Sequence, residues 1–214
     1  MDLMTRISKF KESEYEPNKD FYIKLEKGQN PHTLFIGCSD SRVDAETLLR
    51  AKAGEIFQIR NIANIVSRAD ESGAHIAVVS AIEYAVKVLK VKNIVVCGHS
   101  DCGGCAAIRK LEEYRETLPY TSKWISQSVS ISDDIDSKYP DMEEEEKLVM
   151  LEKLNAVQQL ENLMTYEFIR EKTESGDLNL YACYYDIGTG DISLYAAHDD
   201  DMTHISIFSD VMKK

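Results

Sequence analysis

The chain has 214 residues, of which 43% are hydrophobic and 29% charged, a composition that fits one globular domain with its own core. Its formal net charge of -12 argues against a nucleic-acid-binding protein, because phosphate affinity depends on clustered Lys and Arg side chains. No apolar stretch is long enough to cross a bilayer, and the first ten residues lack the pattern of a secretory signal. We therefore expect a cytoplasmic protein without a membrane partner, in which five cysteines favour metal binding or catalysis over disulfides.

The first half of the chain alternates helical and strand patterns. Residues 1–28 predict a helical arm made of two short amphipathic helices. Two short apolar runs, Thr33 to Gly37 and Ile56 to Ile59, predict buried strands. An apolar period of three and four residues from about Gly73 to Lys90 predicts a helix, and it leads to a third buried strand at Asn93 to Cys97.

The second half predicts one long helix and a hairpin. The acidic segment Asp141 to Glu146 opens an apolar helical stripe that continues to Phe168 and that we interpret as packing. Strand patterns at Leu178 to Tyr185 and Ile192 to Ala196 flank a Gly-Thr-Gly turn. We predict a single domain over residues 1–214 of the α/β class, with a mostly parallel central β-sheet flanked by helices and a C-terminal helix and β-hairpin.

Two polar turns carry the residues suited to chemistry. CSDSR (38–42) and GHSDCGG (98–104) each follow a predicted parallel strand, so both belong at the carboxyl edge of the sheet. Cys38, His99 and Cys102 offer two thiolates and one imidazole, a donor set that suits Zn²⁺. Three protein ligands leave a fourth position for water, which is typical of a catalytic zinc site rather than a structural one.

Asp40 and Arg42 follow the first candidate ligand at spacings of two residues. This spacing predicts that Arg42 holds Asp40 off the metal through a bidentate ion pair. A released Asp40 would instead take the fourth position and switch the site off. We therefore expect activity to rise with pH through the mildly alkaline range.

Four segments together resemble the beta-class carbonic anhydrases. They are CSDSRV (38–43), RNIANIV (60–66), SAIEYAV (80–86) and NIVVCGHSDCGG (93–104), within a match from about Phe10 to Leu111. The resemblance implies reversible hydration of carbon dioxide to bicarbonate and a proton. It also implies one zinc ion per subunit on Cys38, His99 and Cys102, with Asp40 and Arg42 as the catalytic dyad.

The plant-like branch of this family is the best match. By that resemblance Gln29 orients the substrate, Phe57 and Tyr84 line its apolar pocket, and Gly103 offers a backbone N–H to substrate oxygen. The branch implies a pocket completed across a dimer interface, hence a homodimer or a dimer of dimers, and a zinc ion with water at rest. A second branch has a bicarbonate-inhibition site that includes a Trp, and here the single Trp124 is distant in sequence from the motifs.

Several alternatives stay open at this point. The same zinc chemistry would serve a hydrolase of carbonyl sulfide or carbon disulfide, and a fourth protein ligand would give a non-catalytic zinc-stabilised interaction protein. Cys102 and Cys105 form a C-x-x-C pair, but redox chemistry would leave Cys38, His99 and Asp40 without a role. We interpret the remaining histidines as structural or surface residues, and the segment 197–204 as a solvated acidic turn; those histidines are His32, His75, His198 and His204.

Overall fold

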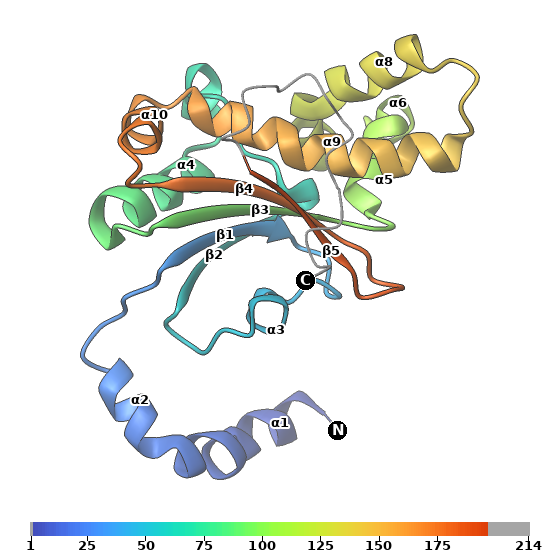
Figure 1. Cartoon of the computed structure of the whole chain (residues 1–214). Coiled ribbons are helices and arrows are strands. Elements are labelled where there is room, and N and C mark those ends of the chain that lie inside the picture. The colour runs from blue at the N-terminus through green and yellow to red at the C-terminus, as the bar shows by residue number, and fades with distance from the viewer. Residues whose placement is uncertain (1, 197–214) are drawn as a thin grey trace.

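A five-stranded sheet lies at the centre of the computed structural model, which describes residues 2–196 (Figure 1). The strand order is β2-β1-β3-β4-β5, in which the first four strands run parallel and β5 pairs antiparallel with β4. The predicted α/β class, parallel sheet and C-terminal hairpin are confirmed. The strands are β1 (Thr33–Cys38), β2 (Ile56–Asn61), β3 (Asn93–His99), β4 (Asn179–Tyr185) and β5 (Ile192–Ala196).

Helices cover the two faces of the sheet unequally. Helices α4, α9 and α10 lie on one face, where they bury the main apolar core, and α3 lies on the opposite face (Figure 1). The predicted helix at 73–90 begins at Ile76 and continues beyond α4 as a π-helical turn over Tyr84–Leu89. The α-helices are α1 (Leu3–Phe10), α2 (Lys19–Leu25), α3 (Ala45–Leu49), α4 (Ile76–Glu83), α5 (Gly103–Arg109), α6 (Leu111–Tyr114), α7 (Pro119–Ile125), α8 (Val129–Lys138), α9 (Glu144–Met164) and α10 (Glu167–Glu174).

The register of the sheet brings the two polar turns together. Gly37 of β1 lies opposite Cys97 of β3, so the residues that follow both strands emerge at one edge. β1 is buried along its whole length, as expected of a strand packed on both faces. The carboxyl ends of β1 and β3 therefore place the motif residues side by side.

The N-terminal arm lies apart from the sheet (Figure 1). Helices α1 and α2 are joined by π- and 3-10-helical turns over Lys11–Tyr15 and Glu16–Asn18, and none of these elements contains a buried residue. Asp2 caps α1 by accepting a hydrogen bond from the backbone N–H of Thr5, at 3.0 Å. Five apolar side chains of the arm are exposed: Leu3, Met4, Ile7, Phe10 and Ile23.

Among residues 2–196 the structure contains no helix with the length and apolar character needed to cross a membrane. The acidic segment 197–204, with His198 and His204, lies outside the described residues.

Candidate metal centre

Cys38, His99 and Cys102 form one buried cluster at the carboxyl edge of the sheet. One ligand atom from each residue lies within 4.8 Å of the others, and the two Sγ atoms are 3.9 Å apart. Cys38 ends β1, His99 ends β3, and Cys102 has extended backbone angles at the N-cap of α5. The sequence distance of 64 residues between the two cysteines is thus closed by parallel strand pairing.

The imidazole of His99 is oriented by the main chain and has one nitrogen left over. Its Nδ1 lies 3.0 Å from the carbonyl oxygen of Ser100, so we assign Nδ1–H as the donor. Its Nε2 is buried and has no hydrogen-bond partner among the described residues. A buried polar atom without a partner is costly, and a metal ion bound at Nε2 removes that cost.

The two thiols are also poised for a cation. The neighbouring Cys102 thiol and burial raise the pKa of Cys38 to about 12. Chiefly the thiol of Cys105 raises the pKa of Cys102 to about 12. A divalent cation between the sulfurs would replace these protons, because metals bind the thiolate form. The donor set and the unpartnered nitrogen together fit zinc.

Asp40 and Arg42 form an ion pair beside this cluster. The Nε and Nη2 atoms of Arg42 donate to the two carboxylate oxygens of Asp40 at 3.0 and 2.7 Å, which is a bidentate arrangement. The backbone N–H of Arg42 donates to the same carboxylate at 2.9 Å. These hydrogen bonds hold the pKa of Asp40 well below its usual range, so the carboxylate is ionised at neutral pH.

Arg42 links the two motif turns, and Arg60 holds the first of them. Arg42 also donates to the carboxylate and the carbonyl oxygen of Asp101, both at 3.0 Å, and thereby reaches the second turn. Arg60 donates to the carbonyl oxygens of Cys38, at 3.1 Å, and Asp40. Neither Asp101 nor Arg60 could be assigned from sequence, because their contacts depend on how the turns fold.

Helix α9 supplies a row of buried polar side chains that sequence reasoning interpreted as ordinary packing. Asn155, Gln159 and Asn162 hydrogen-bond backbone atoms of the segment 63–66, at 2.7 to 2.9 Å. Glu152, on the same face, accepts a hydrogen bond from the backbone N–H of Cys102 at 2.7 Å. The available signal was polar residues at helical spacing within an apolar stripe.

Three of the expected substrate residues lie far from the metal cluster of their own chain. Phe57 pairs in register with Leu34, four residues before Cys38, which corresponds to about 13 Å along the strand. Tyr84 lies beside Phe57, with ring centroids 6.2 Å apart and the rings tilted by 34°, and is 46% exposed. Gln29 is exposed and precedes β1. The single chain therefore does not bring Gln29, Phe57 and Tyr84 to the cluster.

Gly103 and Trp124, both considered in the sequence analysis, lie in or close to the motif segments. Gly103 begins α5 directly after Cys102, and a Cβ atom there would meet no atom within 4 Å, so the backbone is open to a small molecule. Trp124 is close to a motif in space, because its indole N–H donates to the carbonyl oxygen of Ile62 at 2.9 Å. The edge of the Trp124 ring packs on His75.

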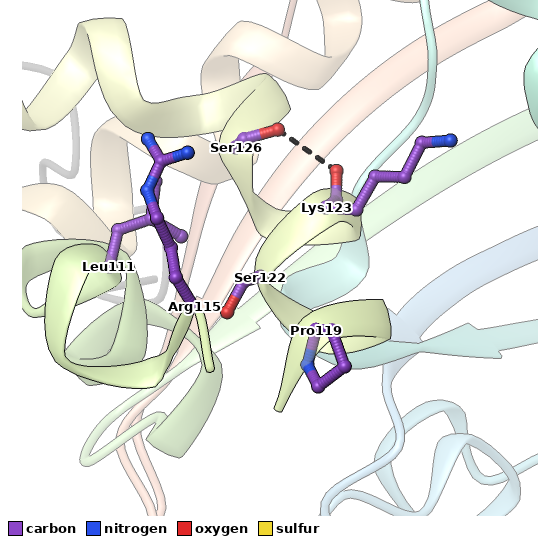
Figure 2. Close-up of a pocket in the computed structure, with 6 residues that line it drawn as sticks. All are labelled: Leu111, Arg115, Pro119, Ser122, Lys123 and Ser126. Carbon is purple, nitrogen blue, oxygen red and sulfur yellow. Dashed lines mark hydrogen bonds between the residues drawn. The ribbon is translucent and has the colours of Figure 1, made fainter. Parts of the chain in front are cut away.

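A pocket lies between α6 and α7 (Figure 2). It has a volume of about 410 Å³, and Figure 2 shows the hydroxyl of Ser126 donating to the carbonyl of Lys123. Its described lining contains no thiol, imidazole or carboxylate, so it lacks the donors of a zinc site. The lining residues are Leu111, Arg115, Pro119, Ser122, Lys123 and Ser126.

Comparison with known proteins identifies the family. A family profile described as carbonic anhydrase matches residues 33–192, which include the metal cluster and Asp40. The chain belongs to the beta carbonic anhydrases. A carbonic anhydrase of Helicobacter pylori (strain J99) is 35% identical over 190 residues, which cover 87% of this chain and 86% of that protein.

Solved beta-carbonic anhydrase structures share the fold. The beta-carbonic anhydrase CcaA superposes with a TM-score of 0.85 at 33% identity, covering 90% of this chain and 86% of that one. A tetrameric beta-carbonic anhydrase of Sordaria macrospora has a TM-score of 0.78 at 32% identity, with coverage of 92% and 95%. As a beta carbonic anhydrase the chain is an enzyme of carbon dioxide hydration, so the alternative of a non-catalytic interaction protein is not retained.

Proposed function

We propose that the chain interconverts carbon dioxide and bicarbonate with one zinc ion per subunit, held by Cys38, His99 and Cys102. The observation that carries this proposal is the buried set of two thiols and one imidazole whose Nε2 has no partner in the described chain. Bound zinc supplies Lewis acidity that makes a water molecule nucleophilic near neutral pH. The surrounding residues orient that water and the substrate.

Asp40 is the residue that aims the nucleophile in this proposal. Its carboxylate, kept ionised by Arg42, accepts a hydrogen bond from the attacking water and directs an oxygen lone pair at the carbon of carbon dioxide. The N–H of Gly103, on the open side of α5, donates to a substrate oxygen. Replacing Asp40 by Asn should keep zinc but lower turnover about 10- to 100-fold, because a partner of the reactive water is lost.

We also infer that Asp40 leaves the fourth coordination position to solvent at rest, as in the plant-like branch. Support comes from the ion pair, in which both carboxylate oxygens of Asp40 accept hydrogen bonds from Arg42. A carboxylate engaged in this way must break a bidentate pair before it can bind a metal.

The substrate pocket is proposed to be shared between two subunits. Gln29, Phe57 and Tyr84 lie at the amino edge of the sheet, and a second copy is needed to place such residues over Cys38 and His99. Two apolar side chains on the same helical segment as Tyr84, at Ile76 and Val88, are exposed and would be buried in such an interface.

We propose a homodimer or a dimer of dimers as the working assembly. The N-terminal arm has an exposed apolar stripe, and the α3 face of the sheet has an apolar groove of about 480 Å³ that includes Phe35, Leu48 and Val95. An arm from a second copy would cover such a groove.

We also propose a cytoplasmic location. The five cysteines are all free, which supports a reducing, cytoplasmic setting.

One experiment tests the proposed activity and its remaining rival. Purified protein with a measured zinc content is assayed for carbon dioxide hydration by stopped-flow with a pH indicator, and for sulfide release from carbonyl sulfide and carbon disulfide. We expect stoichiometric zinc and fast hydration with slower sulfide release. Protein that binds no zinc, or that releases sulfide faster than it hydrates carbon dioxide, would contradict the proposal.

A further inference from the structure

Glu152 places a buried carboxylate directly behind a proposed zinc ligand. The side chain comes from α9, and the residue is only 1% exposed. Its Oε1 accepts the backbone N–H of Cys102 at 2.7 Å, and its Oε2 accepts the hydroxyl of Tyr184 at 2.9 Å. Both carboxylate oxygens are therefore engaged, one by the metal turn and one by β4.

The backbone of the metal turn needs such support. Asp101, just before Cys102, has a left-handed φ of 56°, a conformation that costs free energy in a residue other than glycine. Cys102 has the N-cap position of α5 but makes no side-chain cap, because its thiol is in the metal cluster. The backbone N–H of Cys102 instead donates to Glu152, which lies 50 residues further along the chain.

The position of Glu152 is fixed by close packing of α9 on the sheet. A Cβ atom at Gly98 would lie 2.9 Å from the carbonyl oxygen of Glu152, so only glycine allows this approach of helix and strand. Tyr184 is on β4, the neighbour of the strand that ends at His99. The Nζ atom of Lys153 lies 5.0 Å from the centroid of the Tyr184 ring. Helix α9, β3 and β4 together therefore determine where the carboxylate meets Cys102.

We propose that Glu152, supported by Tyr184, is a positioning residue that holds Cys102 in its metal-binding geometry. The proposal rests on the proposed zinc site and extends it to a residue on α9. Partners that orient metal ligands commonly contribute 10- to 100-fold to metal affinity. Glu152 acts here through the backbone amide of the ligand, so its effect depends on an oxygen acceptor at that position.

Three variants separate positioning from mere filling of space. Glu152→Ala removes the acceptor, Glu152→Gln restores an amide oxygen of the same reach, and Tyr184→Phe removes the second contact. Zinc affinity is measured by competition with a chromophoric chelator. The protein is also loaded with Co²⁺, whose sulfur-to-metal charge-transfer absorption reports the geometry of the thiolates.

We expect Glu152→Ala to bind zinc about 10- to 100-fold more weakly and to shift the cobalt charge-transfer band. Glu152→Gln should recover most of the lost affinity, and Tyr184→Phe should lose less than Glu152→Ala. Tyr166→Phe is the matched control, because Tyr166 is a buried tyrosine whose hydroxyl donates to the carbonyl of Ser67 instead. It should leave affinity and spectrum unchanged whatever it does to stability.

The outcomes distinguish this inference from the proposed function. Unaltered protein that binds no zinc or cobalt would overturn both. Unaltered protein that binds zinc, with Glu152→Ala binding equally well and showing the same cobalt spectrum, would overturn only the role of Glu152. A Gln variant no better than the Ala variant would overturn positioning through an acceptor oxygen. Folding of each variant is checked by circular dichroism before metal is added.

Discussion

The two edges of the sheet differ in how complete they are within one chain. At the carboxyl edge, Cys38, His99 and Cys102 are buried and converge, and Asp40 has its Arg42 partner in place. At the amino edge, Tyr84 is exposed and lies beside Phe57, which pairs with a β1 residue four positions before Cys38. One chain therefore brings all three candidate metal ligands together, whereas the proposed substrate pocket is expected to need a second copy.

The largest effect is expected from removing a proposed zinc ligand at the carboxyl edge. Cys38→Ser replaces a thiolate by a hydroxyl, a much poorer zinc ligand, so zinc and activity should both be lost. Cys183→Ser is the matched control, since Cys183 is also buried in the sheet but belongs to no ligand cluster among the described residues. Zinc content per chain and stopped-flow rates are compared. Stoichiometric zinc in the Cys38 variant would refute the assigned ligand set.

The pH dependence of zinc affinity tests the thiols at the same edge of the sheet. The pKa values of Cys38 and Cys102 are raised to about 12, so both thiols carry protons at neutral pH. Binding must release both protons, and the apparent affinity should rise by up to about 100-fold per pH unit in the neutral range. Chelator competition at several pH values measures the slope. An affinity independent of pH would mean that the thiols do not bind the metal.

A smaller effect is expected at the amino edge. Tyr84→Ala should leave zinc content unchanged but lower kcat/KM by on the order of tenfold or more, because the pocket that orients the substrate is opened. Tyr120→Ala is the matched control, since Tyr120 is 90% exposed and lies on α7. Zinc assay and stopped-flow kinetics are run on both. Equal rates in the two variants would mean that Tyr84 is not part of the substrate pocket.

The smallest effect is expected at Asp101, whose carboxylate accepts a hydrogen bond from Arg42 alongside that of Asp40. Its side chain is 85% exposed, so solvent screens its ion pair and the expected contribution is about 1 kcal/mol or less, under about fivefold in rate. Asp101→Asn keeps a residue that tolerates the left-handed backbone. The rates of wild type and variant should become equal as the salt concentration is raised, because salt screens the ion pair. A loss as large as that of Asp40→Asn would show that Asp101 has a direct role.

The cluster at the carboxyl edge could be predicted from sequence because its members follow two apolar strands whose parallel pairing brings their ends together. Short-range spacing also sufficed for Asp40 and Arg42, which contact each other within one turn. Glu152 could not be found in this way, since its contact with Cys102 depends on how α9 packs across β3.

Other parts of the molecule show the same limit. Gln29, Phe57 and Tyr84 were assigned from family resemblance alone, because nothing in their local sequence distinguishes a pocket wall from surface or core. Helices α7 and α8 were not predicted, since their apolar residues are sparse and partly exposed. Trp124 meets Ile62 across 62 residues of sequence, a contact that depends on tertiary packing.

The most direct test of a site shared between chains uses mixed dimers. A Cys38→Ser chain and a Tyr84→Ala chain are given different affinity tags, co-expressed, and purified through both tags. The mixed dimer then combines the zinc ligands of one chain with Tyr84 of the other at a single site. We expect this dimer to recover about half of the wild-type rate although both parents are impaired. A mixed dimer as slow as its parents, or a failure to capture any dimer through both tags, would contradict a site shared between chains.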